Sequence, residues 1–187
     1  MNYDEFKKFI NEVDNLVYKT FFEFCYFTGV RRSEALAIQK SDLDLISKTI
    51  SINKSIPHRQ VGSRRGISSL KTPKSYRILK LDELFNNILP LLNQDGPFIF
   101  GGQELLSTST ITRRLKESLK KAKLRDYTFH EFRHSNGSLL LDTNVPLIKV
   151  SKRLGHSCVD VTARVYAHVF KNVDDESADV FNHIRKK

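Results

Sequence analysis

The sequence lacks the features that place a protein in a membrane or outside the cell. Its most apolar segment, LVYKTFFEFCYFTGV at residues 16–30, is interrupted by Lys19 and Glu23 and is too short to cross a bilayer. The N-terminus, MNYDEFKKF, is charged from its fourth residue, unlike a signal peptide. The two cysteines, Cys25 and Cys158, have no C-x-x-C spacing, which favours a reducing compartment without a disulfide framework. We therefore expect a cytoplasmic protein with no membrane partner.

The chain also lacks internal repeats, low-complexity tracts and linkers rich in Pro, Gly or Ser, and its 187 residues suffice for one domain with a sizeable core. What it has in excess is positive charge. The 31 Lys and Arg residues against 21 Asp and Glu give a net charge of +10, and the cations are spread through the sequence. This balance favours a polyanionic partner, most often nucleic acid, although a merely soluble basic surface has the same composition.

Hydrophobic periodicity predicts an α+β domain that is mainly α, with a small antiparallel sheet of three strands. Apolar residues at helical spacing predict helices within residues 3–26, 31–39, 81–92, 109–124 and from 129 onward, with breaks at 144–146 and at Gly155. The segment Lys48–Ile56 alternates apolar and polar residues, as a strand does. The segments GISSLKT and SYRILKL follow it, separated by Pro73 and Lys74, and are expected to form a hairpin.

The stretch FHEFRHS poses a choice between a metal site and an anion site. Its core, HEFRH, fits the H-E-x-x-H pattern of zinc metalloproteases. However, Thr128 and Glu131 form a capping box that starts a helix at Phe129, and the free N–H groups of a helix N-terminus favour an anion. Arg133, one turn after His130, adds a permanent cation that would repel zinc. The stretch therefore indicates a phosphate ligand, and neither a metal nor another cofactor is expected.

Four further residues stand in patterns that are weak one by one. Arg31 follows a glycine turn in TGVRRSE, and Lys71 lies in LKTPKS at the edge of the expected hairpin. His156 in LGHS follows the helix stop at Gly155, and Tyr166 in TARVYAH comes ten residues later. A lone tyrosine on a helix is usually a core residue, and a lone G-x-R is usually a turn. The information lies in their order and spacing along the chain.

Taken together, these pieces resemble the tyrosine recombinases, the integrase family of phages and mobile elements. The segments FTGVRRSEALAI, LKTPKSYRIL, HEFRHS and LGHSCVDVTARVYAHV stand in family order and spacing between about Tyr3 and Phe170. The resemblance implies the tyrosine recombinase catalytic fold and a site-specific recombinase that cleaves and rejoins DNA through a 3′-phosphotyrosine. It assigns catalytic roles to Arg31, Lys71, His130, Arg133, His156 and Tyr166. Lys74 is the alternative to Lys71, since hairpin register cannot be read from sequence.

These residue types suit phosphodiester chemistry without a metal ion. Two guanidiniums can bind the non-bridging oxygens in bidentate fashion, and His156 can donate a further hydrogen bond. Tyr166 would attack phosphorus with His130 as its proton acceptor, and the lysine would protonate the leaving 5′-oxygen. We expect Glu34 and Glu131 to orient the arginines, and the basic segment RRLKESLKKAK to contact DNA phosphates.

The resemblance also implies partners and a domain organisation. The partners are double-stranded DNA attachment sites and other recombinase protomers in a tetramer on that DNA, with C-terminal segments as candidates for exchange between protomers. Residues 1–187 are expected to form the catalytic domain of an integrase from a bacterial phage or conjugative transposon, with the N-terminal core-binding and arm-binding domains absent from this chain. Two alternatives stay open: a type IB topoisomerase, which reseals the same strand, and a non-catalytic DNA-binding module.

Overall fold

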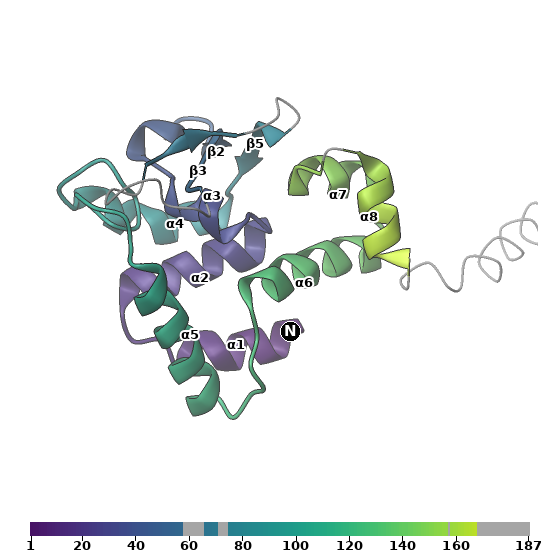
Figure 1. The fold of residues 1–187 in the computed structure, drawn as a ribbon, viewed down its shortest axis with the longest axis horizontal. Helices are drawn as coiled ribbons and strands as arrows, with labels where there is room; N and C mark the ends of the chain where they lie inside the picture. The colour runs from purple at the N-terminus through teal and green to yellow at the C-terminus, as the bar shows by residue number, and fades with distance from the viewer. Residues whose placement is uncertain (58–65, 71–74, 157, 168–187) are drawn as a thin grey trace, which may run out of the picture.

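The computed structural model describes residues 1–57, 66–70, 75–156 and 158–167 (Figure 1). Its helices are α1 (Tyr3–Asn11), α2 (Leu16–Thr28), α3 (Arg32–Leu36), α4 (Glu83–Ile88), α5 (Thr108–Lys121), α6 (Phe129–Asp142), α7 (Leu147–Leu154) and α8 (Val159–Val165), with 3-10 turns η1 (Lys40–Asp42) and η3 (Leu89–Asn93). Its strands are β1 (Leu43–Asp44), β2 (Thr49–Ile52), β3 (Lys54–Ser55), β4 (Ser68–Ser69) and β5 (Arg77–Lys80). The predicted class, mainly helical α+β, is confirmed. No helix in these ranges is long and apolar enough to cross a membrane.

Aromatic side chains form the centre of the main core. Helix α2 runs through the middle of the molecule and packs against α1, α3, α4 and α6 (Figure 1). Phe6 of α1 stacks on Tyr26 of α2 with ring centroids 3.8 Å apart, and Phe132 of α6 meets both rings edge-on. All three rings are buried. This shared core fixes the start of α6 against the end of α2, which is where two of the predicted site residues lie.

The predicted small antiparallel sheet of three strands is confirmed, in the order β1-β2-β5, but β1 was not predicted, β4 lies in a separate pair with β3, and the predicted hairpin is wrong. Strand β5 pairs with β2, where Ile50 lies opposite Leu79, and β4 pairs with β3, where Lys54 lies opposite Ser69. The strands β4 and β5 therefore do not pair with each other. Both pair with the stretch at residues 49–55, β5 with its first part and β4 with its last. The buried Ile50 requires an apolar neighbour on the inward face, which β5 supplies and the Ser-rich β4 does not.

The last three helices carry a second, smaller hydrophobic cluster. The predicted breaks are confirmed, since Asn144 and Gly155 have positive φ values of 61° and 68° and end α6 and α7 respectively. The cluster consists of Leu141, Val150, Leu154 and Tyr166. Helices α7 and α8 lie at the far end of α6, and α7 also contacts β5 (Figure 1). Tyr166 is thus held by a different part of the molecule from Arg31.

Candidate active site

A buried carboxylate holds Arg31 at the start of α3. Arg31 is the N-cap residue of α3, two residues after Gly29 ends α2 in a left-handed conformation. The Glu34 carboxylate accepts hydrogen bonds from the Arg31 backbone N–H at 2.8 Å and from its Nη1 at 2.9 Å. Glu34 is buried, whereas 46% of the Arg31 side chain is exposed. The expectation that Glu34 orients an arginine is confirmed for Arg31, which is anchored by one edge and reaches solvent with the rest.

Arg77 of β5 is a second partner of the same carboxylate. Its Nη2 lies 2.8 Å from Glu34 Oε2, and its Nη1 donates to Oε1 at 3.4 Å. Burial opposes ionisation of Glu34, but hydrogen bonds and charge from Arg77, and then from Arg31, outweigh it and hold the pKa of the carboxyl below its ordinary value. Glu34 is therefore an anion shared by two guanidiniums.

Sequence reasoning missed Arg77, although its strand contained a signal. In SYRILK, alternation puts Arg77 on the same face as Leu79, which is buried, while Ile78 points outward and is exposed. A charged residue on the inward face of a strand requires a buried partner of opposite charge. The identity of that partner, Glu34, depends on how α3 packs against the sheet, which the sequence does not give.

Arg133 lies buried in the second turn of α6, and one of its terminal nitrogens lacks a hydrogen-bond acceptor among the described residues. Its Nη1 donates to the carbonyl oxygen of Gly29 at 2.8 Å, and its buried Nη2 has no hydrogen-bond partner among the described residues. Burial and then the neighbouring charge of Arg31 lower the pKa of Arg133 to about 10, so the guanidinium remains charged at neutral pH. A buried donor without a partner costs about 1–3 kcal/mol, which a bound anion would offset.

His156 shares this electrostatic environment. It directly follows Gly155, and its Nδ1 lies 2.7 Å from the Thr162 hydroxyl. Burial, followed by the charges of Arg133, Arg31 and Arg77, lowers the pKa of His156 to about 4. The imidazole is therefore neutral at pH 7. Arg31, Arg77 and Arg133, which we call the arginine cluster, come from three separate elements and act on this one ring.

The start of α6 is as the sequence predicts, but one expected role is wrong. Thr128 Oγ1 accepts a hydrogen bond from the Glu131 backbone N–H at 3.2 Å, and Glu131 accepts one from the Thr128 backbone N–H at 2.8 Å. Glu131 was expected to orient an arginine of the site. It instead forms an ion pair with Arg125 at 2.7 Å. Glu131 and Arg133 are two positions apart in α6, and side chains at that spacing do not face each other.

His130 lies exposed in the first turn of α6, one turn before Arg133. Its ring meets the ring of His134 edge-on, with centroids 4.6 Å apart. Within the part of the chain that the structure describes, no three His, Cys, Asp or Glu side chains are grouped so that they could hold a metal ion. The His130 side chain is open to solvent, and its role as proton acceptor stays a prediction.

Tyr166 is close to Arg133 in space but is packed away from solvent. It follows the last residue of α8, is only 1% exposed, and its hydroxyl donates a hydrogen bond to the Arg133 carbonyl oxygen at 3.4 Å. The ring lies directly on Gly137, where an added Cβ would be 2.1 Å from the phenolic oxygen. Burial raises the pKa of Tyr166, and the charge of Arg133 opposes this only in part. The phenol is therefore in a protonated, shielded position.

The sixth predicted residue, Lys71, lies outside the described residues, as does its alternative, Lys74. The structure therefore brings together Arg31, Arg133 and His156, places Tyr166 against the back of Arg133, and leaves His130 at the helix start.

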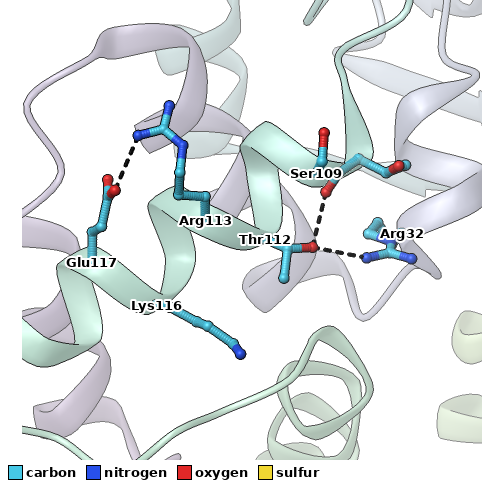
Figure 2. Close-up of a pocket in the computed structure, with 7 residues that line it drawn as sticks. Arg32, Ser109, Thr112, Arg113, Lys116 and Glu117 are labelled. Carbon is cyan, nitrogen blue, oxygen red and sulfur yellow. Dashed lines mark hydrogen bonds and ion pairs between the residues drawn. The ribbon is translucent and has the colours of Figure 1, made fainter.

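A cation-lined groove includes Arg32, the residue that follows Arg31 in the sequence (Figure 2). It has a volume of about 610 Å³ and lies between Arg32 of α3 and one face of α5. Arg32 donates to the Thr112 hydroxyl at 3.4 Å, and Arg113 pairs with Glu117 at 3.0 Å. Lys116 extends from the same face of α5 as Thr112 (Figure 2). The groove combines cations with hydroxyl groups, the two side-chain types that contact nucleic-acid backbones.

Comparison with known proteins identifies the family. Residues 1–173 match the model of the phage integrase family, and the chain belongs to this family. The ICEBs1 integrase of Bacillus subtilis strain 168 is 34% identical over 194 residues, which cover 94% of this chain and 52% of that protein. The integrase of Staphylococcus phage L54a is 32% identical over 166 residues, which cover 80% and 47%. The chain spans about half the length of these curated relatives.

Solved structures share the fold. The Tn1549 transposon integrase in complex with transposon right end DNA matches with a TM-score of 0.79 at 18% identity, covering 94% of this chain and 63% of that chain. The XerA recombinase matches with a TM-score of 0.69 at 21% identity, covering 97% and 64%. The helical domain with its small antiparallel sheet is thus the catalytic fold of the tyrosine recombinases.

Proposed function

We propose that this chain is the catalytic domain of a site-specific DNA recombinase, an integrase that cleaves and rejoins DNA through a 3′-phosphotyrosine. Its substrates would be double-stranded attachment sites of a mobile element in the bacterial cytoplasm, bound by a tetramer of protomers. One observation carries the proposal: the buried Arg133, whose Nη2 has no partner among the described residues, lies in one field with Arg31 and His156. Such a cluster requires an anion, and the similar proteins include the ICEBs1 integrase and a transposon integrase solved in complex with DNA.

Three groups would bind the scissile phosphate. Arg133 Nη2 and the exposed part of Arg31 would each donate to non-bridging oxygens, where negative charge builds up in the transition state. The neutral His156 would contribute a third donor. If the Thr162 hydroxyl donates to Nδ1, the ring proton is on Nε2, which then faces away from Thr162 and can donate to the phosphate.

Tyr166 would supply the nucleophile after a change of position. In its observed place the phenolic oxygen donates to a backbone carbonyl and is buried, so attack requires the α8 end to move Tyr166 toward the phosphate. The phenol would lose its proton to His130 as its oxygen bonds to phosphorus. The P–O5′ bond breaks, and the 5′-oxygen takes a proton from Lys71. The ester retains the bond energy, so rejoining to another 5′-hydroxyl needs no ATP.

DNA would lie along the groove between Arg32 and α5. Arg32, Arg113 and Lys116 would meet phosphates, which supply most of the affinity and make it fall with salt. The ion pair of Arg113 with Glu117 is exposed and thus weak enough to be exchanged for a phosphate. Binding along this helix would leave Arg31, Arg133 and His156 to act on one phosphate.

A pool of nicked suicide DNA with random sequence around the nick tests the proposal. After cleavage, the short fragment between the cut and the nick, which carries the free 5′-hydroxyl, diffuses away. The enzyme therefore cannot rejoin the strand, stays attached to the DNA and is detected on a denaturing gel. We expect an adduct that forms in excess EDTA and whose DNA yields the preferred site when sequenced. Absence of any adduct, with DNA still bound, would support the non-catalytic binding module.

Topology separates the recombinase from a type IB topoisomerase. With two copies of the recovered site on one supercoiled plasmid, a recombinase yields strand-exchanged products. A topoisomerase yields only relaxed circles, because it reseals the strand that it cut. Exchanged products are the outcome that we expect.

A further inference from the structure

We propose that Arg77 is a positioning residue that sets the orientation of Arg31 through Glu34 and ties the strand β5 to the turn that carries His156. This inference rests on the proposed function, because positioning has a readout only if Arg31 acts on a phosphate. Arg77 has no role in the six-residue set, and its guanidinium is nevertheless buried at the centre of the cluster.

The first observation is the geometry at Glu34. Arg77 approaches the carboxylate with both terminal nitrogens, at 2.8 Å and 3.4 Å, and its side chain is only 6% exposed. Arg31 binds the same carboxylate from the solvent side at 2.9 Å. Arg77 therefore sets the position of the Glu34 oxygens from the buried side, and with it the direction of the Arg31 guanidinium.

The second observation is that Arg77 reaches two further segments. Its Nη1 also donates to the Ser75 carbonyl oxygen at 3.1 Å, which fixes the entry into β5. On the other side, an added Cβ on Gly155 would lie 2.7 Å from Arg77 Nη1 and 3.1 Å from its Cζ. Gly155, in its left-handed conformation at φ 68°, therefore lets the turn before His156 rest directly on the guanidinium.

These contacts require an arginine and indicate an indirect role. A lysine keeps the charge but has one nitrogen, which cannot bridge both carboxylate oxygens while donating to Ser75. Because the guanidinium lies beneath Glu34 and Gly155, it does not reach the exposed edge where Arg31 would meet a phosphate. Arg77 acts on the reaction only through the groups that it holds.

The test uses DNA in which a methyl group replaces one non-bridging oxygen of the scissile phosphate, prepared as both stereoisomers. This phosphate is neutral and does not need the charge of Arg31. On normal DNA we expect Arg77→Met to slow adduct formation about 10²-fold, the size of effect that a small misplacement produces. On the isomer that rescues Arg31→Ala, Arg77→Met should recover to within a few-fold of the parent protein. Arg77→Lys should fall between Arg77→Met and the parent.

Two control variants separate positioning from folding. Lys80→Met removes an exposed cation from the same strand and its ion pair with Asp82, and should leave the rate unchanged. Arg77→Met/Glu34→Gln removes the buried carboxylate together with its partner, and it replaces Arg77→Met in the same assay if the single variant fails to fold. Thermal denaturation and half-site binding are measured for every variant before its rate.

The outcomes are distinguishable. If Arg77→Met cleaves normal DNA as fast as the parent, the inference is wrong while the proposed function stands. If it is slow on both DNAs although folded and DNA-bound, Arg77 does not act through Arg31. If the parent protein forms no adduct with any DNA, the proposed function itself fails. Rescue by the neutral phosphate, matched between Arg77→Met and Arg31→Ala, is the result that supports the inference.

Discussion

The arginine cluster and Tyr166 are held in place by different kinds of contact. Arg31 and Arg77 share the buried carboxylate of Glu34, and Arg133 is fixed by the carbonyl at the end of α2. All of these contacts border the large aromatic core. Tyr166 instead belongs to a small cluster with three aliphatic residues of α6 and α7, and its hydroxyl makes one long hydrogen bond of 3.4 Å. Under the proposed function, the half that stabilises charge is preformed by ion pairs and hydrogen bonds, whereas the half that supplies the nucleophile is held mainly by apolar packing.

This difference fits what the proposed function would require of each half. Donors that stabilise a transition state are most effective when they need no rearrangement during the reaction. A nucleophile would gain from the opposite arrangement, since a buried phenol with a raised pKa is unreactive in its observed place. Under the proposed function, the observed structure would be a resting state in which the phosphate-binding groups are in place and Tyr166 is still buried.

The largest expected effect separates the two halves completely. Tyr166→Phe should abolish the covalent adduct while leaving half-site affinity unchanged, because only the phenolic oxygen is lost. Its stability should fall by no more than about 0.5–1.5 kcal/mol, the contribution of a single hydrogen bond. Adduct formation is measured on a denaturing gel and binding by gel shift. An adduct that survives in this variant would remove Tyr166 from the mechanism.

The preformed half is tested with Arg31→Ala, since the exposure of this side chain leaves the core intact. We expect cleavage to slow by about 10²–10³-fold, the cost of one lost charge-stabilising donor. Half-site affinity should fall much less, because many other cations contact the backbone. Both quantities are measured on the same suicide DNA. Equal losses in affinity and rate would mean that Arg31 is only an anchor.

The assignment of Lys71 can be tested although it lies outside the described residues. A thiolate, with a pKa near the 8.5 of cysteine, leaves without a proton. DNA with sulfur at the bridging 5′ position should therefore be cleaved by Lys71→Ala nearly as fast as by the parent, while normal DNA is cleaved slowly. Arg31→Ala should not be rescued, because its defect concerns the non-bridging oxygens. Rescue of Lys74→Ala in place of Lys71→Ala would move the general acid to Lys74.

The sequence predicted those parts of the fold that depend on local chemistry. The Thr128–Glu131 capping box and the glycine stops at Gly29 and Gly155 were read correctly because each is set by a few adjacent residues. The hairpin was wrong because strand pairing depends on residues far apart, and the stretch at 49–55 is long enough to pair with two segments in succession.

The candidate site shows the same limit. The spacing of the motifs predicted Arg31, Arg133, His156 and Tyr166 as site residues, but it could not show that Tyr166 lies buried behind the backbone of Arg133. It also paired Glu131 with the wrong arginine, because the side chain of Arg125 approaches Glu131 from outside the motif. The contact between Arg77 and Glu34 joins residues 43 positions apart and is decided by packing alone.

The substitution Gly137→Ala can destabilise the buried position of the Tyr166 ring. The new methyl group would lie 2.1 Å from the phenolic oxygen and 2.3 Å from Cζ, so the ring must leave its place. If Tyr166 has to leave this place before attack, the variant should form adduct several-fold faster on suicide DNA. Ser138→Ala, one residue further along α6, is the control. A slower rate in a folded Gly137→Ala protein would show that the observed position is the productive one.

The smallest expected effect is a change in the pKa of His156, which tests whether Arg31 lies close enough to act on this ring. Its pKa of about 4 lies below the ordinary value of 6.5, so the unfolded chain binds a proton between these pH values and the folded protein does not. Its contribution to stability is therefore full above about pH 6.5 and is lost as the pH falls toward 4. Because Arg31 is one cause of the shift, after burial and Arg133, Arg31→Ala should raise the pKa of His156. It should also reduce the loss of stability between pH 6.5 and 4.

NMR titration of the ring protons gives the pKa of His156, and Lys80→Met, whose charge is not among the causes, should leave it unchanged. An unchanged pKa in Arg31→Ala would place Arg31 outside the field at His156, and the three groups would then not converge on one phosphate.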